Sequence, residues 1–195
     1  MKITPSTFFN RPAPKVAHDL IGCILARKNG SKTERFVITE TEAYEGFKDK
    51  ASHASRGKTA RNEVMFRSAG HIYVYFTYGM HWMLNIVTGP KDYPAAVLIR
   101  GGIDCNTNMP VNGPARLTKR LKINSTLNGR RLGHTSGLWI EKHQKRTTGN
   151  QSFTRQLIAG QSRQSRTIKR LPRVGVDYAG PVWSKKKWRF VLNEK

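Results

Sequence analysis

Phe36-Val37-Ile38-Thr39-Glu40-Thr41-Glu42-Ala43-Tyr44 is the stretch that decides the fold of this chain. Its β-branched and aromatic residues predict a strand. Because side chains alternate along a strand, one face is expected to carry Val37, Thr39, Thr41 and Ala43, and the other Ile38, Glu40, Glu42 and Tyr44. Two glutamates on one face are unusual in a chain with 35 Lys+Arg, 12 Asp+Glu and a formal net charge of +23.

Short apolar segments separated by turns lie on both sides of this stretch. Pro12-Ala13-Pro14 suits the first turn of a short helix, and Ala115 to Leu121 predicts another. Further strands are predicted over residues 23–26, 71–78, 83–87, 95–100, 137–141, 173–176 and 188–191. Strands outnumber helices, so the sequence predicts one α+β domain over residues 1–195 with an antiparallel sheet. The polar, basic segment 142–170 is expected to be a mobile loop.

The positive charge is unevenly distributed along the chain. Residues 1–115 carry 15 Lys+Arg and 9 Asp+Glu, whereas residues 116–195 carry 20 and 3. Such a field attracts nucleic acid or an anionic membrane. One interpretation is a solvated basic surface that improves solubility. The other is a half of the chain that contacts phosphates, joined to a more neutral half that carries out chemistry.

Other features of the sequence narrow the class of protein. No apolar run is long enough to span a membrane, and Met1-Lys2-Ile3-Thr4-Pro5 lacks the apolar segment of a signal peptide. Cys23 and Cys105 form neither a metal pattern nor a disulfide framework, and the six histidines show no ligand spacing. We therefore expect an intracellular, soluble protein without metal or cofactor.

Three groups of residues are candidates for chemistry. A carboxylate near aromatic rings, such as Glu42 beside Tyr44, can act as a general base. Spacing alone does not choose between Glu40 and Glu42, and either could simply pair with an arginine. The aromatic run from Tyr73 to Tyr78 is either core or a set of stacking surfaces for bases. Polar residues in or at the ends of apolar strands, Asn85 and Arg100, face either a pocket or solvent.

Taken together, these residues are a stronger signal than any one of them. In order and spacing they resemble the alkyladenine (3-methyladenine) DNA glycosylase family, over about residues 8–190. The motifs that carry the resemblance are Thr41-Glu42-Ala43-Tyr44, His53, Arg61-Asn62, Met65-Phe66, Tyr73-Val74-Tyr75, Tyr78-Gly79-Met80, Asn85, Arg100, Gly113-Pro114 and Arg173-Val174-Gly175-Val176. The resemblance implies a curved antiparallel sheet surrounded by short helices, and excision of damaged purines from duplex DNA by a monomeric enzyme.

The resemblance also implies a role for each matching residue. Glu42 matches the general base that activates water, while Arg100 and the backbone near Val174 match groups that hold that water. The pocket for the flipped base is matched by Tyr44, His53, Met65 and Tyr75, and Asn85 matches the residue that rejects the amino group of guanine. Tyr78 matches the side chain that fills the gap in the duplex, with Met80 beside it.

Two parts of the chain depart from the family's pattern, the segment 142–170, which does not align with it, and His81. His81 stands where mammalian members carry an aromatic residue, so contacts to neighbouring bases are expected to differ. No lysine occupies a position that the family uses as a nucleophile, so water is the expected nucleophile, without a lyase step. The alternative is a basic nucleic-acid-binding protein without catalysis, which explains the charge but assigns no role to Glu42.

Overall fold

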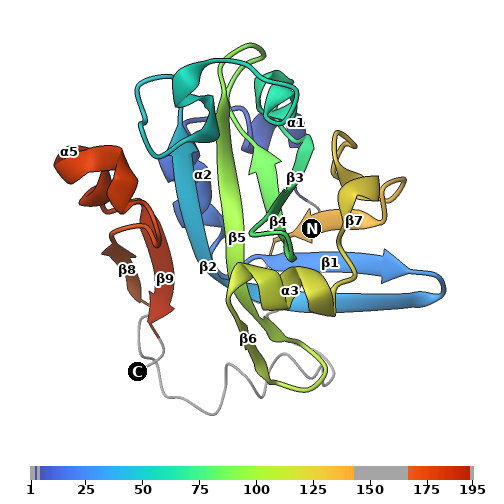
Figure 1. Cartoon of the computed structure of the whole chain (residues 1–195). Coiled ribbons are helices and arrows are strands. Elements are labelled where there is room, and N and C mark those ends of the chain that lie inside the picture. Colours follow the sequence, from blue (N-terminus) through green and yellow to red (C-terminus); the bar gives the residue numbers. More distant parts are fainter. Residues whose placement is uncertain (1–2, 4, 143–166, 194–195) are drawn as a thin grey trace.

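The computed structural model describes residues 3, 5–142 and 167–193. Within them, nine strands form one antiparallel sheet with the order β3-β4-β5-β2-β1-β7, while β6 pairs with β5, β9 with β2, and β8 with β9. The sheet bends strongly, since β1 and β7 run crosswise to β5 in Figure 1. This confirms the predicted α+β class. The strands are β1 Ile24–Asn29, β2 Lys32–Glu45, β3 Ile72–Thr77, β4 His81–Val87, β5 Ala95–Asp104, β6 Pro110–Asn112, β7 Leu138–Glu141, β8 Thr167–Leu171 and β9 Arg189–Asn193.

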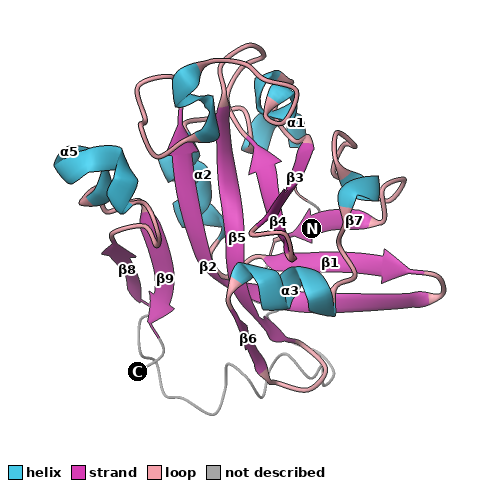
Figure 2. Cartoon of the chain, in the orientation of Figure 1, coloured by secondary structure: helices cyan, strands magenta, loops and turns pink. Residues whose placement is uncertain are grey.

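The helices are short and lie around the sheet (Figure 2). They are α1 Pro5–Phe8, α2 Ala13–Leu20, α3 Pro114–Arg120 and α5 Gly180–Ser184, with single 3₁₀ turns η1 His53–Arg56, η2 Glu63–Phe66, η3 Ser125–Leu127 and η5 Asp177–Ala179. In the part of the chain that the structure describes, none of the helices is long and apolar enough to cross a membrane.

Helix α2 covers one face of β2. Pro12 is its N-cap residue and Pro14 lies in its first turn, and its apolar side, including Val16 and Leu20, is fully buried. The hydroxyl of Thr41 donates a 2.8 Å hydrogen bond to the carbonyl of Ala17, which fixes the helix to the strand. Burying a side chain such as Leu20 contributes roughly 1.5–3 kcal/mol. The face of β2 that carries Thr41 therefore belongs to the core, and the opposite face is left for other contacts.

The pairing of β2 with β5 shifts register near Thr39. Ile38 lies opposite Gly102, Glu40 opposite Gly101, and Thr41 opposite Ile99. A bulge of this kind interrupts the alternation of side chains. As a result Ile38 shares the main core cluster with Ala43, and the predicted grouping of Ile38 with the two glutamates is wrong.

Two further expectations about strands are corrected by the structure. Strand β5 does not end at Gly101-Gly102 but continues to Asp104, because these glycines allow a close approach to β2: a Cβ on Gly102 would lie 2.9 Å from the carbonyl oxygen of Val37. Residues 173–176 form a turn instead of a strand, because Gly175 has a φ of +71°. Within the expected loop 142–170, Thr167 to Arg170 belong to β8, and residues 143–166 lie outside the described residues.

Candidate active site

A pocket of about 450 Å³ opens on the face of β2 opposite α2. Its walls come from the end of β2, from β3, β4 and β5, from η1, and from the turn that follows β8. Eight of the ten residues predicted from the sequence to form the site line it together: Tyr44, His53, Met65, Tyr75, Tyr78, Asn85, Arg100 and Val174. The remaining two, Glu42 and Met80, are not part of the lining.

Glu42 lies fully buried directly behind the pocket wall. Its Oε2 accepts hydrogen bonds from the Tyr44 hydroxyl at 2.9 Å and from Arg100 Nη1 at 3.3 Å. Its Oε1 accepts a 2.8 Å hydrogen bond from the backbone N–H of Val174. All three donors belong to residues that line the pocket. The carboxylate is therefore separated from the pocket only by the groups that orient it.

The environment of Glu42 changes its acidity in two directions. Burial raises the pKa of Glu42 above its ordinary value, while Arg100, the Val174 N–H and the Tyr44 hydroxyl hold that rise back. A carboxyl group with a raised pKa accepts a proton more readily than an exposed one, as a general base requires. For Arg100, burial lowers the pKa, but the carboxylates of Glu42 and Glu40 outweigh burial and raise the pKa overall.

Glu40 differs from Glu42 although both face the same side of β2. The Arg100 Nε donates a 2.9 Å hydrogen bond to Glu40 Oε1, and Arg189 Nε lies 2.8 Å from the same oxygen in an ion pair. Glu40 thus pairs with arginines, which was one of the two interpretations that the sequence left open for each glutamate. Glu42 instead accepts from a tyrosine, a backbone amide and only one arginine, so the structure separates two residues that spacing could not.

Aromatic rings and a histidine form one wall of the pocket. His53 Nδ1 lies 3.1 Å from the hydroxyl of Tyr73, and its ring meets that of Tyr75 edge to face at 4.6 Å. Burial and the charge of Arg61 lower the pKa of His53, so its imidazole is neutral near pH 7. Burial raises the pKa of Tyr75 to about 12, which keeps its hydroxyl protonated.

Asn85 is a polar residue held rigidly in this apolar surface. Its Nδ2 donates hydrogen bonds to the carbonyl oxygens of Tyr73, at 3.2 Å, and Met83, at 3.4 Å. Because only 3% of the residue is exposed, its amide cannot turn away from a group that enters the pocket. The role that the resemblance implied for Asn85, discrimination between bases, stays a prediction.

The rim of the pocket exposes large side chains. Tyr78 lies at the turn between β3 and β4 with a φ of +52°, and 81% of it is exposed. Met80 follows in the same turn and is also largely exposed. Across the rim, Tyr178 of η5 lines the pocket and donates a 3.0 Å hydrogen bond to the carbonyl of Ala51.

Sequence reasoning missed some residues of the site. Tyr73 was named only as part of a motif, yet its hydroxyl contacts His53 at the pocket wall. Tyr178 had a weak signal, an aromatic residue three positions after Gly175. Arg61, also named without a role, lies 5.4 Å above the Tyr75 ring. Among the described residues no group of three potential ligands could hold a metal ion; the absence of metal remains a prediction.

A buried carboxylate behind an aromatic pocket is typical of an enzyme that encloses a planar ring and acts beside it. A model of the methylpurine-DNA glycosylase (MPG) family matches residues 7–195 of this chain. The chain therefore belongs to the MPG family and is a DNA glycosylase, a hydrolase that acts on N-glycosyl bonds.

Individual relatives agree with the family match. A protein from Methanocella arvoryzae is 38% identical over 204 residues, which cover 97% of this chain and 92% of that protein. One from Psychrobacter cryohalolentis is 36% identical over 210 residues, covering 95% and 89%. One from Carboxydothermus hydrogenoformans is 44% identical over 153 residues, covering 72% and 80%. All three carry the provisional name of 3-methyladenine DNA glycosylase.

Proposed function

We propose that this protein flips damaged purines out of duplex DNA into the pocket beside Glu42 and hydrolyses their N-glycosidic bond with water. The observation that carries the proposal is the fully buried Glu42 carboxylate, held by three donors that all line an aromatic pocket. Alkylated adenine and guanine are the primary substrates, and hypoxanthine and ethenoadenine are further ones.

Binding begins with the backbone of the DNA. A chain with a net charge of +23 contacts phosphates with little sequence preference. The target base must then leave the stack, which costs a few kcal/mol and less for a damaged or mispaired base. The exposed ring of Tyr78 enters the vacated space and offsets part of that cost.

The pocket selects among flipped bases by charge and by shape. The rings of Tyr44 and Tyr75 offer faces to a cationic alkylated purine, which gains from lying against them. His53, neutral near pH 7, adds no repulsion. The fixed amide of Asn85 clashes with the exocyclic amino group of normal guanine. Normal guanine, a neutral base and a poor leaving group, is therefore rejected. 7-Methylguanine keeps the amino group, but its positive charge favours binding against the rings and makes it a good leaving group, so it is still released.

Glu42 carries the chemical step. As the bond between C1′ and the base nitrogen breaks, its electron pair leaves with the base and positive charge grows on the sugar. The negative carboxylate stabilises that charge. A water molecule held by Arg100 and the backbone at Val174 bonds to C1′ and gives its proton to Glu42. An alkylated purine leaves without further protonation, whereas a neutral base such as hypoxanthine needs an acid.

Water as the nucleophile implies a monofunctional enzyme. The described residues that line the pocket include no lysine, and a lyase step would need an amine to form a Schiff base. Treatment of the reacting complex with borohydride is expected to trap no covalent adduct between protein and DNA. A trapped adduct would show that an amine attacks C1′.

The proposal is tested with a duplex that contains a single ethenoadenine or hypoxanthine. Wild-type protein is expected to release the base and leave an abasic site, which alkali converts to a strand break. If no modified purine is released while the duplex is still bound, the non-catalytic DNA-binding alternative is favoured. We further propose that the protein acts as a monomer inside the cell, which sedimentation of the free protein and fractionation of its host can check.

A further inference from the structure

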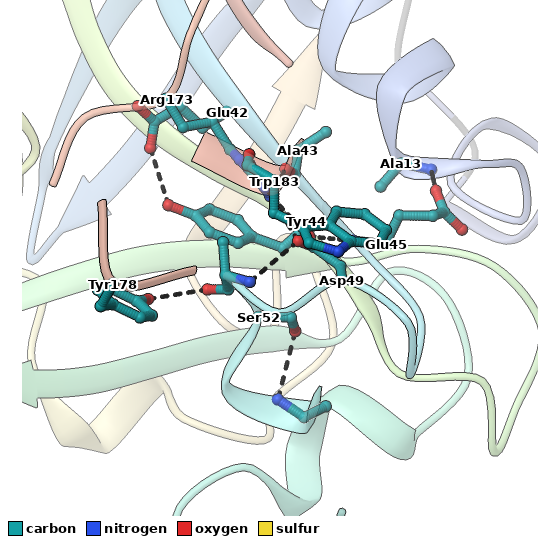
Figure 3. A network of polar contacts seen from close by, with 12 residues as sticks. Ala13, Glu42, Ala43, Tyr44, Glu45, Asp49, Ser52, Arg173, Tyr178 and Trp183 are labelled. Carbon is teal, nitrogen blue, oxygen red and sulfur yellow. Dashed lines mark hydrogen bonds and ion pairs between the residues drawn. The ribbon is translucent and has the colours of Figure 1, made fainter. Parts of the chain in front are cut away.

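Asp49 and Arg173 form an ion pair whose two side chains are fully buried (Figure 3). The pair is bidentate: Arg173 Nη1 donates to Asp49 Oδ2 at 2.6 Å, and Nη2 donates to Oδ1 at 2.9 Å. A buried ion pair is weak evidence for stability, because desolvation of both charges can exceed their attraction. Its location next to the pocket points to a different role.

The pair joins several segments of the site. Arg173 also donates to the carbonyl of Ala43, between Glu42 and Tyr44 on β2, at 2.9 Å. Its guanidinium lies 4.9 Å from the centre of the Tyr44 ring. Asp49 in turn accepts hydrogen bonds from the backbone N–H groups of Glu45 and Ala51, both at 3.1 Å. Strand β2, the loop after it and the turn after β8 are thus held together.

The residues that follow each partner belong to the active site. Val174, next to Arg173, donates its backbone N–H to Glu42, while Ala51 to His53, shortly after Asp49, line the pocket. We propose that Asp49 and Arg173 are positioning residues and together form a clamp, which holds the Val174 N–H and the Tyr44 hydroxyl on the Glu42 carboxylate. This inference rests on the proposed function, in which Glu42 is the general base.

The inference has a consequence for pH dependence. The Val174 N–H and the Tyr44 hydroxyl both lower the pKa of Glu42 against the effect of burial, so releasing them raises it. Activity that needs the ionised carboxylate would then be lost at a higher pH. The other groups that face Glu42 are Glu40 on β2, Arg100 on β5, Tyr75 on β3 and Tyr178 on η5.

The test compares Arg173→Lys and Asp49→Asn with Arg120→Lys. Arg120 bridges Glu34 and Asp104 away from the pocket with its side chain 39% exposed, so it controls for the loss of an arginine ion pair outside the site. Both clamp variants are expected to release 7-methylguanine at least tenfold more slowly, with the acidic limb of the pH profile moved to higher pH. The control is expected to lower thermal stability without moving the limb. Lower stability with an unchanged limb in the clamp variants would overturn the inference.

Two further measurements test the clamp even where a substitution also destabilises the fold. Guanidinium added to Arg173→Ala should restore the rate and the pH profile, whereas methylammonium should not. In the unaltered protein, the amide of Val174 should exchange with solvent as slowly as that of Ala43 in β2; much faster exchange would contradict the clamp even if no variant folds. If wild type releases no base, the proposed function fails. A carbon-13 NMR titration of Glu42 still tests the clamp, because the pKa of Glu42 should be higher in the Arg173→Lys and Asp49→Asn variants than in wild type.

A second inference comes from a separate cleft of about 740 Å³ between α2, β8 and β9. It lies on the α2 side of the sheet, since Phe190, which lines it, pairs with Thr41 and packs in the main core. The pocket beside Glu42 opens on the other side of β2. A DNA segment seated over the active site therefore leaves this cleft free.

The cleft carries positive charge that acidic side chains of the described residues do not neutralise. Lys15, Arg170 and Lys187 line it and are exposed, and none has an acidic partner among the described residues. Lys186 lies over the Trp188 ring at 4.4 Å. The single acidic residue in the lining, Asp19, is already paired with Arg11 and His18. Exposed lysine and arginine side chains of this kind contact the phosphates of duplex DNA without reading its sequence.

We propose that this cleft binds the phosphodiester backbone of a second DNA segment while the first occupies the active site. Wild type should hold two differently labelled short duplexes together at low salt. Joint replacement Lys15→Glu, Arg170→Glu and Lys187→Glu should leave one duplex bound, with base release from a single duplex unchanged within about twofold.

The matched control reverses three exposed cations outside both pockets, Lys28, Lys122 and Arg130. It is expected to keep the two-duplex complex. Equal loss of that complex in the control and in the cleft variant would overturn the proposal. Displacement of the second duplex by a polyglutamate peptide, but not by single-stranded DNA of equal charge, would assign the cleft to an acidic protein instead.

Discussion

At the scale of single residues, the site depends on how two glutamates on one strand face are used. Glu40 is paired with Arg100 and Arg189, whereas Glu42 is fully buried and accepts from a tyrosine and a backbone amide. Period-2 alternation placed both on one face but could not separate them, because the difference arises from β5, β9 and the turn after β8. Only the order of motifs along the chain singled out Glu42.

The raised pKa of Glu42 predicts the pH dependence of the reaction. The base works only when it is ionised, so activity falls as pH decreases through its pKa, which burial places above the ordinary value of 4.5. 7-Methylguanine is the appropriate substrate, since its cationic base needs no acid to leave. When the single-turnover rate is plotted against pH, the midpoint of its fall on the acidic side should therefore lie above pH 4.5.

Glu40→Gln tests the cause of that midpoint. The negative charge of Glu40 raises the pKa of Glu42, and its removal also frees Arg100 to pair with Glu42 alone. Both effects favour the ionised form, so the limb should move to lower pH in this variant. A midpoint that stays in place or rises would contradict the electrostatic account of the site.

At the scale of elements, most strands and their approximate bounds could be predicted from hydrophobic and β-branched patterns, whereas the short strand β6 and the polar strand β8 could not. The bulge near Thr39 could not, because it is set by the close pairing of β2 with the glycines of β5. The same holds for the turn at 173–176. Its residues resemble a strand in sequence, but the buried side chain of Arg173 fixes the backbone by contacts with Asp49, distant in the chain.

Gly102→Ala tests the role of that close pairing. The added Cβ would lie 2.9 Å from the carbonyl oxygen of Val37, which belongs to the backbone and cannot move independently. We expect a loss of about 1–3 kcal/mol in the free energy of unfolding, the usual cost of overpacking, measured by chemical denaturation. Gly101→Ala meets a side-chain oxygen of Thr39 at 3.3 Å and should cost less. If the two variants lose the same free energy of unfolding, the close approach of Gly102 to the backbone of Val37 is not the cause of the loss.

The turn between β3 and β4 carries the residue proposed to enter the duplex. Tyr78→Ala removes the ring that compensates for unstacking, so the flipped state is less populated. We expect base release to slow by roughly tenfold, since an aromatic–base stack contributes about 1–3 kcal/mol. Fluorescence of a 2-aminopurine next to the lesion reports the flipped population. Met80→Ala, at a residue outside the pocket lining, should have a smaller effect; the reverse order would reassign the two side chains.

At the scale of the whole molecule, charge serves binding and a buried network serves chemistry, but the two do not divide the sequence. The net charge of +23 lies mostly in residues 116–195, and the same part of the chain supplies Val174, whose backbone N–H holds the Glu42 carboxylate together with Tyr44 and Arg100. Composition alone predicted the polyanionic partner. It could not predict the residues that position the site from distant parts of the chain, Asp49, Tyr73 and Tyr178, because their contacts exist only in the folded sheet.

Salt dependence distinguishes these two contributions. Affinity for undamaged duplex DNA should fall steeply and linearly on a plot of log K against log salt concentration, since binding releases counterions from phosphates. The single-turnover rate of the fully bound complex should change little, because Glu42 is buried away from the ions. Affinity that does not depend on salt would refute the electrostatic account of binding.

The most direct test of the central claim is the single-turnover rate of base release by Glu42→Gln, with Glu40→Gln as the matched control and DNA affinity measured for both. Loss of a general base typically lowers the rate 10²- to 10⁴-fold. We predict a loss of about that size for Glu42→Gln with DNA affinity within severalfold of wild type, and a much smaller loss for Glu40→Gln. Glu42→Gln protein that binds the lesion duplex and releases the base at nearly the wild-type rate would contradict the account.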